Sequence, residues 1–369
     1  MKILITGAKG FIGKNLVAEL KNRGYKTIFE YDRDTDITVL DEYCRHANFV
    51  FHLAGVNRPK EQKEYMDGNV GFTSELLESL EKNGNTCPVM MSSSIQAELE
   101  NAYGKSKKAG EYLLFTHNKN TGARVLIYRL PNVFGKWCRP NYNSVIATFC
   151  FNITRNIPIQ VSDTSTVISL VYIDDVVNEL INGLEGKECK GDQYCEIPIA
   201  YTTTLGKIVD LIYSFRKSRE EKFIPDMSDE FTKKLYSTYL SYLPENEFGY
   251  ELKMNIDSRG SFTEFIKTKD RGQVSVNILK PGIVKGNHWH HTKNEKFLVV
   301  SGIGVIRFRK VDSDKVIEYA VSGDKLEVID IPIGYAHNIE NLGEGDMVVI
   351  MWANEPFDSK KADTYFLEV

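Results

Sequence analysis

Four side chains in the last third of the sequence have the types and spacing of ligands for a divalent metal ion. His288 and His290 alternate along a short segment, so on a strand their imidazoles would share one face. Glu295 follows after a turn, and His337 comes from a distant segment. Imidazoles with one carboxylate form an open site that suits zinc, manganese, iron or nickel. We therefore expect a metal site at these four residues rather than a surface histidine cluster.

A second set of residues has the chemistry of a proton donor to a carbonyl oxygen. Tyr103 and Lys107 lie four residues apart, hence on one face of a helix. A lysine beside a phenol favours the phenolate and eases proton transfer. The spacing alone is weak evidence, because Tyr213 and Lys217 share it on what reads as an ordinary helix. Tyr103 differs because it follows the triplet Ser92–Ser94 at the end of a predicted strand, where a hydroxyl can polarise the same carbonyl.

A glycine-rich turn connects the first predicted strand to the first predicted helix. Gly7, Gly10 and Gly13 allow a tight turn, close approach of backbone to a pyrophosphate, and tight packing of helix on strand. The helix N-terminus then faces the negative charge. The spacing is G-x-x-G-x-x-G, which departs from the common G-x-G-x-x-G pattern. We predict a dinucleotide site that includes these glycines with Phe11 and Ile12.

The residues after the second predicted strand bear on which dinucleotide is bound. Asp32 lies where an acidic side chain often takes the ribose 2′-hydroxyl, whereas Arg33 can accept a 2′-phosphate. Both would be simply solvated if this were an ordinary strand end. The arginine favours NADP(H).

The first 245 residues have the pattern of a Rossmann-type α/β domain. Strands rich in Val, Ile and Leu alternate with amphipathic stretches, which implies right-handed βαβ units and a doubly wound parallel sheet covered on both faces. The predicted strands are Lys2–Thr6, Lys26–Tyr31, Asn48–Leu53, Pro88–Met91 and Arg124–Leu130. The predicted helices are Phe11–Arg23, Gly71–Asn83, Asn101–His117, Ile173–Gly183, Leu205–Lys217 and Asp229–Ser241.

The pattern changes at residues 245–256, and residues 257–369 read as a separate all-β domain. Short alternating runs punctuated by glycine predict a sandwich or small barrel. The predicted strands are Ser261–Ile266, Gln273–Leu279, Lys296–Val300, Val305–Lys310, Val316–Val321, Leu326–Ile331 and Met347–Ala353.

Composition excludes several classes of function. The chain has 369 residues, 42% of them hydrophobic, which suits two globular domains. Lys plus Arg is 46 and Asp plus Glu is 50, so the net charge of −4 does not suit a nucleic acid or an anionic membrane. No segment resembles a signal peptide or membrane span, and the six cysteines include no Cys-x-x-Cys pair. We expect a cytoplasmic protein with small-molecule or protein partners.

Residues 1–245 resemble the extended short-chain dehydrogenase/reductase family, in its nucleotide-sugar branch. The motifs that carry the resemblance are the glycine turn, the serine triplet, Tyr103-x-x-x-Lys107, His52-Leu53-Ala54-Gly55, Arg129-Leu-Pro-Asn132-Val-Phe-Gly135 and Ile173-Asp174-Asp175-Val176.

The resemblance implies a role for each of these positions. Ser94 and Tyr103 would bind the reacting oxygen, with Tyr103 donating its proton, and Lys107 would hold the nicotinamide ribose. It adds cofactor contacts at Leu53, Ala54 and Gly55, and substrate contacts at Arg129 and Asn132.

Residues 257–369 resemble the cupin family. The first motif is complete, as Gly282-x5-His288-x-His290-x4-Glu295-x6-Gly302. The second is Pro332-x-Gly334-x2-His337-x3-Asn341, with Leu326 where a leading glycine is expected. The resemblance implies a β-barrel whose metal ligands are His288, His290, Glu295 and His337. His291 is then an acid or base, an outer contact, or an alternative ligand.

The order of the two domains resembles bifunctional enzymes of bacterial capsular polysaccharide synthesis. That resemblance implies that the cupin epimerises C3 of a UDP-2-acetamido-2,6-dideoxy-4-hexulose. The reductase would then reduce the C4 ketone with NADPH, on the route to UDP-N-acetyl-L-fucosamine. It also implies a zinc ion and a homodimer. The division is chemically sensible, since a divalent cation stabilises an enolate and hydride addition needs only a proton donor at the oxygen.

Three other interpretations fit the same residues. The cupin metal can be structural, which leaves a 4-keto-sugar reductase alone. The nicotinamide can stay bound, as in a redox-neutral epimerase or dehydratase. The chain can also be a nucleotide-sensing interaction protein, although an intact Ser94, Tyr103 and Lys107 argue against that.

Overall fold

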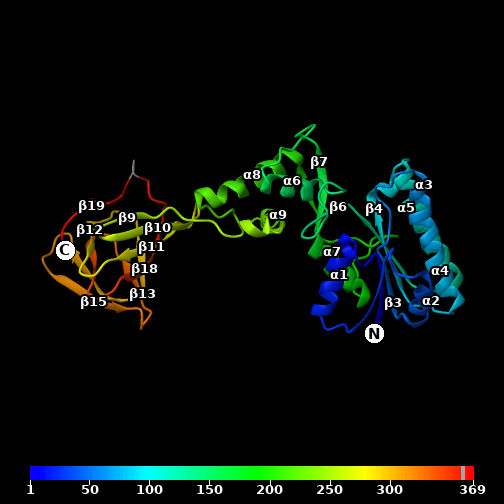
Figure 1. The fold of residues 1–369 in the computed structure, drawn as a ribbon, viewed down its shortest axis with the longest axis horizontal. Helices are drawn as coiled ribbons and strands as arrows, with labels where there is room; N and C mark the ends of the chain where they lie inside the picture. The colour runs from blue at the N-terminus through cyan, green and yellow to red at the C-terminus, as the bar shows by residue number, and fades with distance from the viewer. Residues whose placement is uncertain (359–361) are drawn as a thin grey trace. The chain divides into compact units, whose positions relative to one another are not determined.

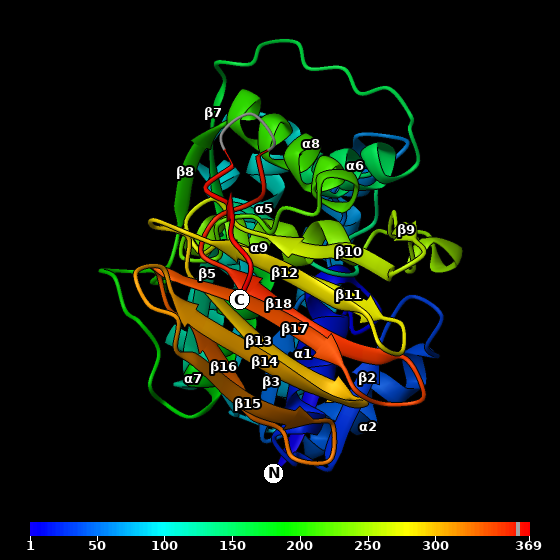
Figure 2. The ribbon, with the colours of Figure 1, turned by 90° about the vertical axis from the view of Figure 1, so that its left-hand side faces the viewer.

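The computed structural model describes residues 1–358 and 362–369. The chain divides into two compact units, 1–213 with 229–244 and 214–228 with 245–369. Each unit is described by itself (Figures 1 and 2). None of the helices in the described residues is both long enough and apolar enough to cross a membrane.

The first unit is built on a five-stranded parallel sheet. Its strand order is β2-β1-β3-β4-β5, and every neighbouring pair is parallel. The strands are β1 Lys2–Thr6, β2 Thr27–Tyr31, β3 Phe49–His52, β4 Val89–Ser94 and β5 Val125–Leu130. Most of their buried residues are apolar, because helices cover both faces and leave no solvated side.

Different helices cover the two faces of this sheet. Leu16 of α1 and Leu180 of α7 join one apolar cluster with strand residues. Leu40 of α2, Leu76 of α4 and Leu114 of α5 join another. The helices of the unit are α1 Phe11–Asn22, α2 Ile37–His46, α3 Lys63–Met66, α4 Phe72–Lys82, α5 Ala102–Thr121, α6 Val145–Thr154, α7 Ile173–Leu184 and α9 Glu230–Leu240. The doubly wound architecture predicted from the sequence is confirmed.

A smaller sheet in this unit departs from the parallel pattern. It contains β6 Asn132–Phe134, β7 Val167–Tyr172 and β8 Tyr201–Thr204. β6 and β7 are parallel, whereas β7 and β8 are antiparallel. These strands were not predicted; β6 and β8, with three and four residues, are too short to show a period.

The second unit contains two sheets whose neighbouring strands are antiparallel, as in a cupin-like β domain (Figure 2). The six-stranded sheet has the order β16-β13-β18-β11-β10-β9, and the five-stranded sheet β15-β14-β17-β12-β19. The strands are β9 Asn255–Asp257, β10 Gly260–Lys267, β11 Gln273–Leu279, β12 Val284–Trp289, β13 Glu295–Ser301, β14 Ile303–Lys310, β15 Val316–Ser322, β16 Val328–Ile331, β17 Tyr335–Asn341, β18 Met347–Ala353 and β19 Tyr365–Phe366. Their inward apolar side chains form one core, so the predicted C-terminal all-β domain is confirmed.

Residues 214–228 belong to this second unit although they precede the end of the first. The helix α8, Leu205–Glu221, runs across the division. The chain after it pairs with β10, because Lys267 N donates to Lys222 O (2.8 Å) and Ile224 N to Lys267 O (2.9 Å). Lys222 and Lys267 also share one carboxylate, Glu264. A single boundary near residue 245 therefore does not describe this segment.

Candidate functional site

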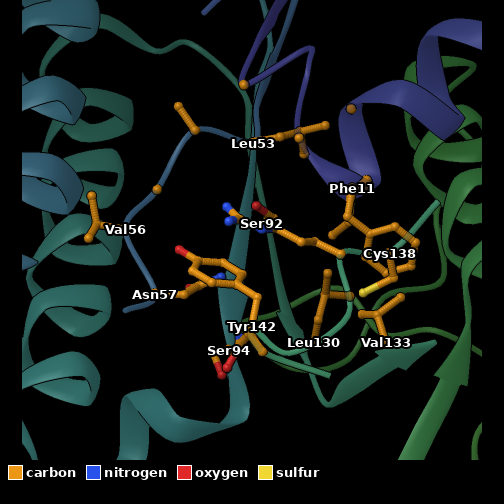
Figure 3. A pocket seen from close by; sticks show the side chains of 18 of the residues that line it. Phe11, Leu53, Val56, Asn57, Ser92, Ser94, Leu130, Val133, Cys138 and Tyr142 are labelled. Atoms are coloured by element: carbon orange, nitrogen blue, oxygen red, sulfur yellow. The ribbon is translucent and has the colours of Figure 1, made fainter. Parts of the chain in front are cut away.

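The predicted reductase residues line one cavity of about 890 Å³ in the first unit. The cavity lies at the carboxyl ends of β1, β3 and β4, the edge at which parallel sheets bind ligands. Side chains from the glycine turn, the serine triplet and a later loop converge on it (Figure 3). The predicted residues that line it are Gly7, Gly10, Phe11, Ile12, Gly13, Asp32, Arg33, Leu53, Ala54, Gly55, Ser94, Tyr103, Lys107 and Asn132.

The glycine turn leaves no room for side chains. Gly7 has φ of 72°, and a Cβ there would lie 2.7 Å from Ala54 N. A Cβ on Gly13 would lie 2.2 Å from Gly7 O, so α1 packs directly on the turn. The first residues of α1 thus open into the cavity with free backbone N–H groups, which suits a pyrophosphate.

Ser94, Tyr103 and Lys107 meet because β4 ends where α5 begins to pass over it. Asn101 caps α5 by accepting from Gly104 N (2.7 Å), which sets the register of the helix. Burial raises the pKa of the Tyr103 phenol, although a hydrogen bond with Ser94 opposes this shift. Tyr103 therefore stays protonated at neutral pH, as a proton donor must.

Lys107 is buried beneath this pair. Its ammonium donates to Ser92 O (2.8 Å), and burial lowers its pKa to about 8. A Cβ on Gly55 would lie only 3.0 Å from Asn69 Oδ1, so a small residue is favoured there. The lysine thus places a positive charge near the cavity floor that weakens as the pH rises above 8.

The carboxylate of Asp32 is already satisfied by the protein. It accepts from Lys9 N (2.8 Å) and from Arg33 N (2.9 Å), one bond to each oxygen. Lys9 itself pairs with Asp34. The exposed Arg33 side chain lines the cavity beside them. Asp32 therefore holds together the glycine turn and the end of β2.

Arg129, which the resemblance gave as a substrate contact, does not line this cavity. Its guanidinium forms a bidentate ion pair with the buried Glu111, through Nε (3.0 Å) and Nη2 (2.7 Å). Glu111 also accepts from Ser93 Oγ (2.5 Å). A buried carboxylate needs such a partner, so Arg129 is held on the side of β5 that faces α5. Asn132 does line the cavity, with its amide bonded to Ser169 O (3.1 Å).

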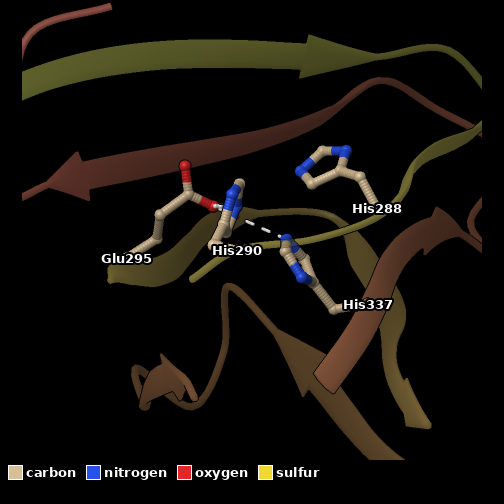
Figure 4. Close-up of side chains that lie close together, drawn as sticks. All are labelled: His288, His290, Glu295 and His337. Carbon is tan, nitrogen blue, oxygen red and sulfur yellow. Dashed lines mark ion pairs between the residues drawn. The ribbon is translucent and has the colours of Figure 1, made fainter. Parts of the chain in front are cut away.

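His288, His290, Glu295 and His337 lie together in the second unit (Figure 4). One donor atom from each lies within 4.8 Å of the others. His288 comes from β12, His290 follows the end of that strand, Glu295 begins β13, and His337 lies on β17. β12 has an irregular register between Gly286 and His288, opposite β17. The alternation expected for a regular strand is therefore only part of the reason that the imidazoles converge.

The chemistry of this donor set fits a divalent metal ion. Nε2 of His290 and of His337 each lie 3.5 Å from Glu295 Oε2. Two ligands of a tetrahedral zinc, each about 2.1 Å from the ion, lie about 3.4 Å apart. All three atoms are buried and have no hydrogen-bond partner among the described residues. Buried orphan donors at this spacing are what a metal would satisfy.

The charges around the cluster favour its metal-binding forms. Burial alone would raise the pKa of Glu295, but His290, His337 and Lys293 together hold it well below its usual range. Lys293 Nζ lies 2.7 Å from Glu295 Oε1, which leaves Oε2 for the histidines. Burial lowers the pKa of His288 to about 4, so its imidazole is neutral at pH 7. A cavity of about 370 Å³ opens onto His288, Glu295 and His337.

Sequence reasoning missed Asp363, which organises the turn between two ligands. Its carboxylate accepts from the backbone of His291 (3.0 Å), Thr292 (2.7 Å) and Lys293 (2.9 Å). Its carbonyl oxygen lies 2.5 Å from His290 Nδ1. An aspartate near the C-terminus has no sequence signal that links it to a histidine motif. His291 is exposed and packs against Trp289 and Tyr365, outside the ligand cluster.

The fold is that of a nucleotide-binding α/β domain joined to a second, β domain. Residues 3–188 match the NAD dependent epimerase/dehydratase family. Residues 255–365 match the polysaccharide biosynthesis C-terminal domain. The chain belongs to the NAD dependent epimerase/dehydratase family and carries this C-terminal domain.

Two similar proteins match this chain over its whole length, and a third matches only part of it. The chain is 44% identical, over all its length and 99% of the relative, to the UDP-2-acetamido-2,6-beta-L-arabino-hexul-4-ose reductase of Pseudomonas aeruginosa. Its structure is similar to that of the capsular polysaccharide assembling protein CapF from Staphylococcus aureus, with a TM-score of 0.95, 57% identity and 100% of each chain covered. The resemblance to capsular polysaccharide enzymes is thus confirmed. A UDP-glucose 4-epimerase of Thermotoga maritima covers 66% of this chain and 98% of its own at 21% identity and a TM-score of 0.55, which shows the fold alone.

Proposed function

We propose that the chain is a bifunctional nucleotide-sugar enzyme that epimerises C3 and reduces the C4 ketone of a UDP-2-acetamido-2,6-dideoxy-4-hexulose. The observation that carries this proposal is the presence of two separate sites, each suited to one of the steps. Ser94, Tyr103 and Lys107 suit ketone reduction, and the histidine cluster suits enolisation. The 44% identical relative is named as a reductase of a UDP-4-hexulose, which supports the substrate class.

In the reduction, the chain's own residues act on the carbonyl oxygen. Bound NADPH would supply the hydride to C4. Ser94 and Tyr103 bind the oxygen, and Tyr103 gives up its proton as negative charge develops there. The ammonium of Lys107 then stabilises the phenolate. Arg33, free on the cavity wall, favours NADPH over NADH.

In the epimerisation, the second unit must make the C3 hydrogen acidic. A divalent ion held by His288, His290, Glu295 and His337 would stabilise negative charge on the C4 oxygen, and this donor set suits zinc. Lys293 keeps Glu295 ionised and oriented. We place this step before the reduction, because the C3 hydrogen is activated only while C4 is a ketone.

The proposal also covers the pathway, the location, the oligomeric state and the domain bounds of the enzyme. The product lies on the route to UDP-N-acetyl-L-fucosamine for capsular polysaccharide. The chain acts in the cytoplasm as a homodimer, with a reductase domain over residues 1–245 and a cupin domain over 257–369. The polysaccharide-biosynthesis domain match over residues 255–365 supports the pathway.

The decisive experiment separates the two steps with His290→Ala. The variant loses one of the cluster's four donors and should lose most of its metal. Exchange of the C3 hydrogen into deuterated water should stop, while reduction of the pre-epimerised 4-keto sugar by NADPH continues. His291→Ala is the matched control, because that ring is exposed outside the cluster.

The same assay tests the other interpretations. If deuterium uptake persists in metal-free His290→Ala, the metal is not needed for epimerisation. That result would favour a reductase whose second-domain metal is only structural. Stoichiometric release of NADP⁺ excludes a redox-neutral epimerase or dehydratase. Absence of NADPH turnover on both C3 epimers in the wild-type protein would favour a nucleotide-sensing protein.

A further inference from the structure

The loop 135–144 forms a wall of the reductase cavity that no sequence motif singled out. It joins β6 to α6 and contributes Trp137, Arg139 and Tyr142 to the lining. Figure 3 shows Cys138 and Tyr142 of this loop among the side chains around the cavity. The wall therefore faces the same space as Ser94 and Tyr103.

The backbone of this loop is strained and firmly held. Trp137 has φ of 68° and Asn141 has φ of 54°. Asparagine tolerates this region, but a bulky aromatic residue rarely adopts it. Tyr242 donates its hydroxyl to Cys138 O (2.5 Å), and Asn141 N donates to Thr148 Oγ1 (3.0 Å). The surrounding structure thus imposes a conformation that an isolated loop would avoid.

The strain leaves the Trp137 ring open to solvent at the cavity. Its side chain is 53% exposed, although indole is one of the most apolar surfaces a protein can bury. No other aromatic ring stacks face to face on it among the described residues, and the Lys136 ammonium lies 5.6 Å from its centroid. A flat exposed ring at a ligand cavity is suited to stack on a planar base.

Arg139 lies two residues away and has no carboxylate partner in the part of the chain that the structure describes. Its guanidinium lies over the Tyr142 ring, 5.3 Å from the centroid, which orients the planar group and leaves its N–H donors free. The other cations of the cavity differ. Lys9 pairs with Asp34 and Lys107 bonds Ser92 O, whereas Lys14 lies on the first helix beside the glycine turn and Arg33 follows β2.

We propose that Trp137, Arg139 and Tyr142 form a subsite for the nucleoside diphosphate of the sugar nucleotide. Trp137 stacks on the base, Arg139 binds the diphosphate through paired hydrogen bonds, and Tyr142 holds the guanidinium in place. The proposal rests on the proposed function, because that function requires a nucleotide-sugar ligand in this cavity. It adds which residues bind the part of the ligand that does not react.

Calorimetric titration of the full chain with UDP, uridine and NADP⁺ tests this subsite. Arg139→Ala should weaken UDP binding by about tenfold or more, since a charge-assisted hydrogen bond to phosphate is lost. It should leave uridine, which has no phosphate, nearly unchanged. Arg139→Lys keeps the charge but not the fork, so we expect a smaller loss. Lys119→Ala, an exposed charge at the far end of α5, is the control.

Trp137→Phe gives a second, optical readout. The other two tryptophans, Trp289 and Trp352, lie in the second unit, so quenching by uridine should disappear in this variant. Repeating the UDP titration in His290→Ala removes any binding of the diphosphate to the metal site.

The possible results distinguish failure of the subsite from failure of the proposed function. If the wild-type chain binds neither UDP nor uridine, the proposed function fails. If UDP binds wild type and Arg139→Ala equally, only the subsite is wrong. If Arg139→Ala weakens NADP⁺ and spares UDP, the arginine serves the cofactor's pyrophosphate and the proposal is overturned.

Discussion

Nδ1 of His290 lies 2.5 Å from the backbone carbonyl oxygen of Asp363. A carbonyl oxygen can only accept, so Nδ1 carries the hydrogen and the lone pair of Nε2 faces Glu295. A hydrogen bond of this kind fixes both the tautomer and the ring orientation of a ligand. Two residues far apart in the sequence therefore share control of the metal site.

Asp363→Ala keeps the backbone carbonyl that contacts His290 and removes only the carboxylate, so it should lower the affinity for the metal through the turn after His290, by about tenfold, the lower end of the effect of losing an outer contact. The carboxylate otherwise anchors the backbone of His291, Thr292 and Lys293, which joins two ligands. Competition with a chelating dye measures the affinity. Asp324→Ala, on an exposed turn, is the control and should leave the metal affinity unchanged. An unchanged affinity in Asp363→Ala would mean that the turn at residues 291–293 keeps its conformation without the carboxylate.

Tyr103→Phe should reduce NADPH-dependent reduction about 100- to 10,000-fold, as loss of a proton donor does. Folding and cofactor binding should persist, because only the hydroxyl is removed. Steady-state oxidation of NADPH with the 4-keto sugar measures the effect. Tyr213→Phe, the tyrosine with the same spacing to a lysine, should be nearly silent. A Tyr103→Phe rate within tenfold of wild type would remove Tyr103 from its proposed role.

Arg33→Ala should raise the KM for NADPH and leave that for NADH nearly unchanged, because only NADPH carries the 2′-phosphate. Asp32 is not expected to replace Arg33 in choosing between the cofactors, because both of its carboxylate oxygens already accept backbone N–H groups. Parallel measurements with the two cofactors decide the matter. Equal effects on both would assign the discrimination to Asp32 instead.

The pH dependence of reduction should show an alkaline limb near pH 8. Burial lowers the pKa of Lys107 to about 8, below its usual value, so the charged form is present below that pH and lost above it. Without the ammonium the Tyr103 phenolate is less stable, so kcat/KM should fall about tenfold per pH unit for a single proton. In Lys107→Met, kcat/KM should be much lower and should no longer fall as the pH rises through 8. A limb that persists in this variant belongs to another group.

Periodicity located the strands of the large parallel sheet and many strands of the second unit, but not β12 and β17. β1 and β11 have the predicted bounds, and β2 and β5 begin one residue later than predicted. α5 extends to Thr121, four residues beyond its predicted end, because Gly122 with φ of 76° ends it and the last turn is too polar to show a period. The helix α2 was missed, since its ten residues bury only Leu40 and Cys44.

The sequence by itself determined the reactive groups that lie close together through a single helix or a single turn. Four residues on a helix bring Tyr103 and Lys107 to one face, and the turn after a strand places Gly7 and Gly13 against α1. These relationships hold for any chain that folds as an α/β domain. The spacing of the histidine motif likewise predicted four residues whose side chains lie together in the structure.

Only the tertiary structure decided which charged groups face a ligand and which face one another. Arg129 lies in a predicted binding motif, yet a buried glutamate 18 residues earlier takes its guanidinium, whereas Arg139 is left facing the cavity. The orientation of His290 likewise depends on a carbonyl 73 residues later. Burying an unpaired charge costs several kcal/mol, so partners are chosen by proximity in space, which spacing along the chain does not reveal.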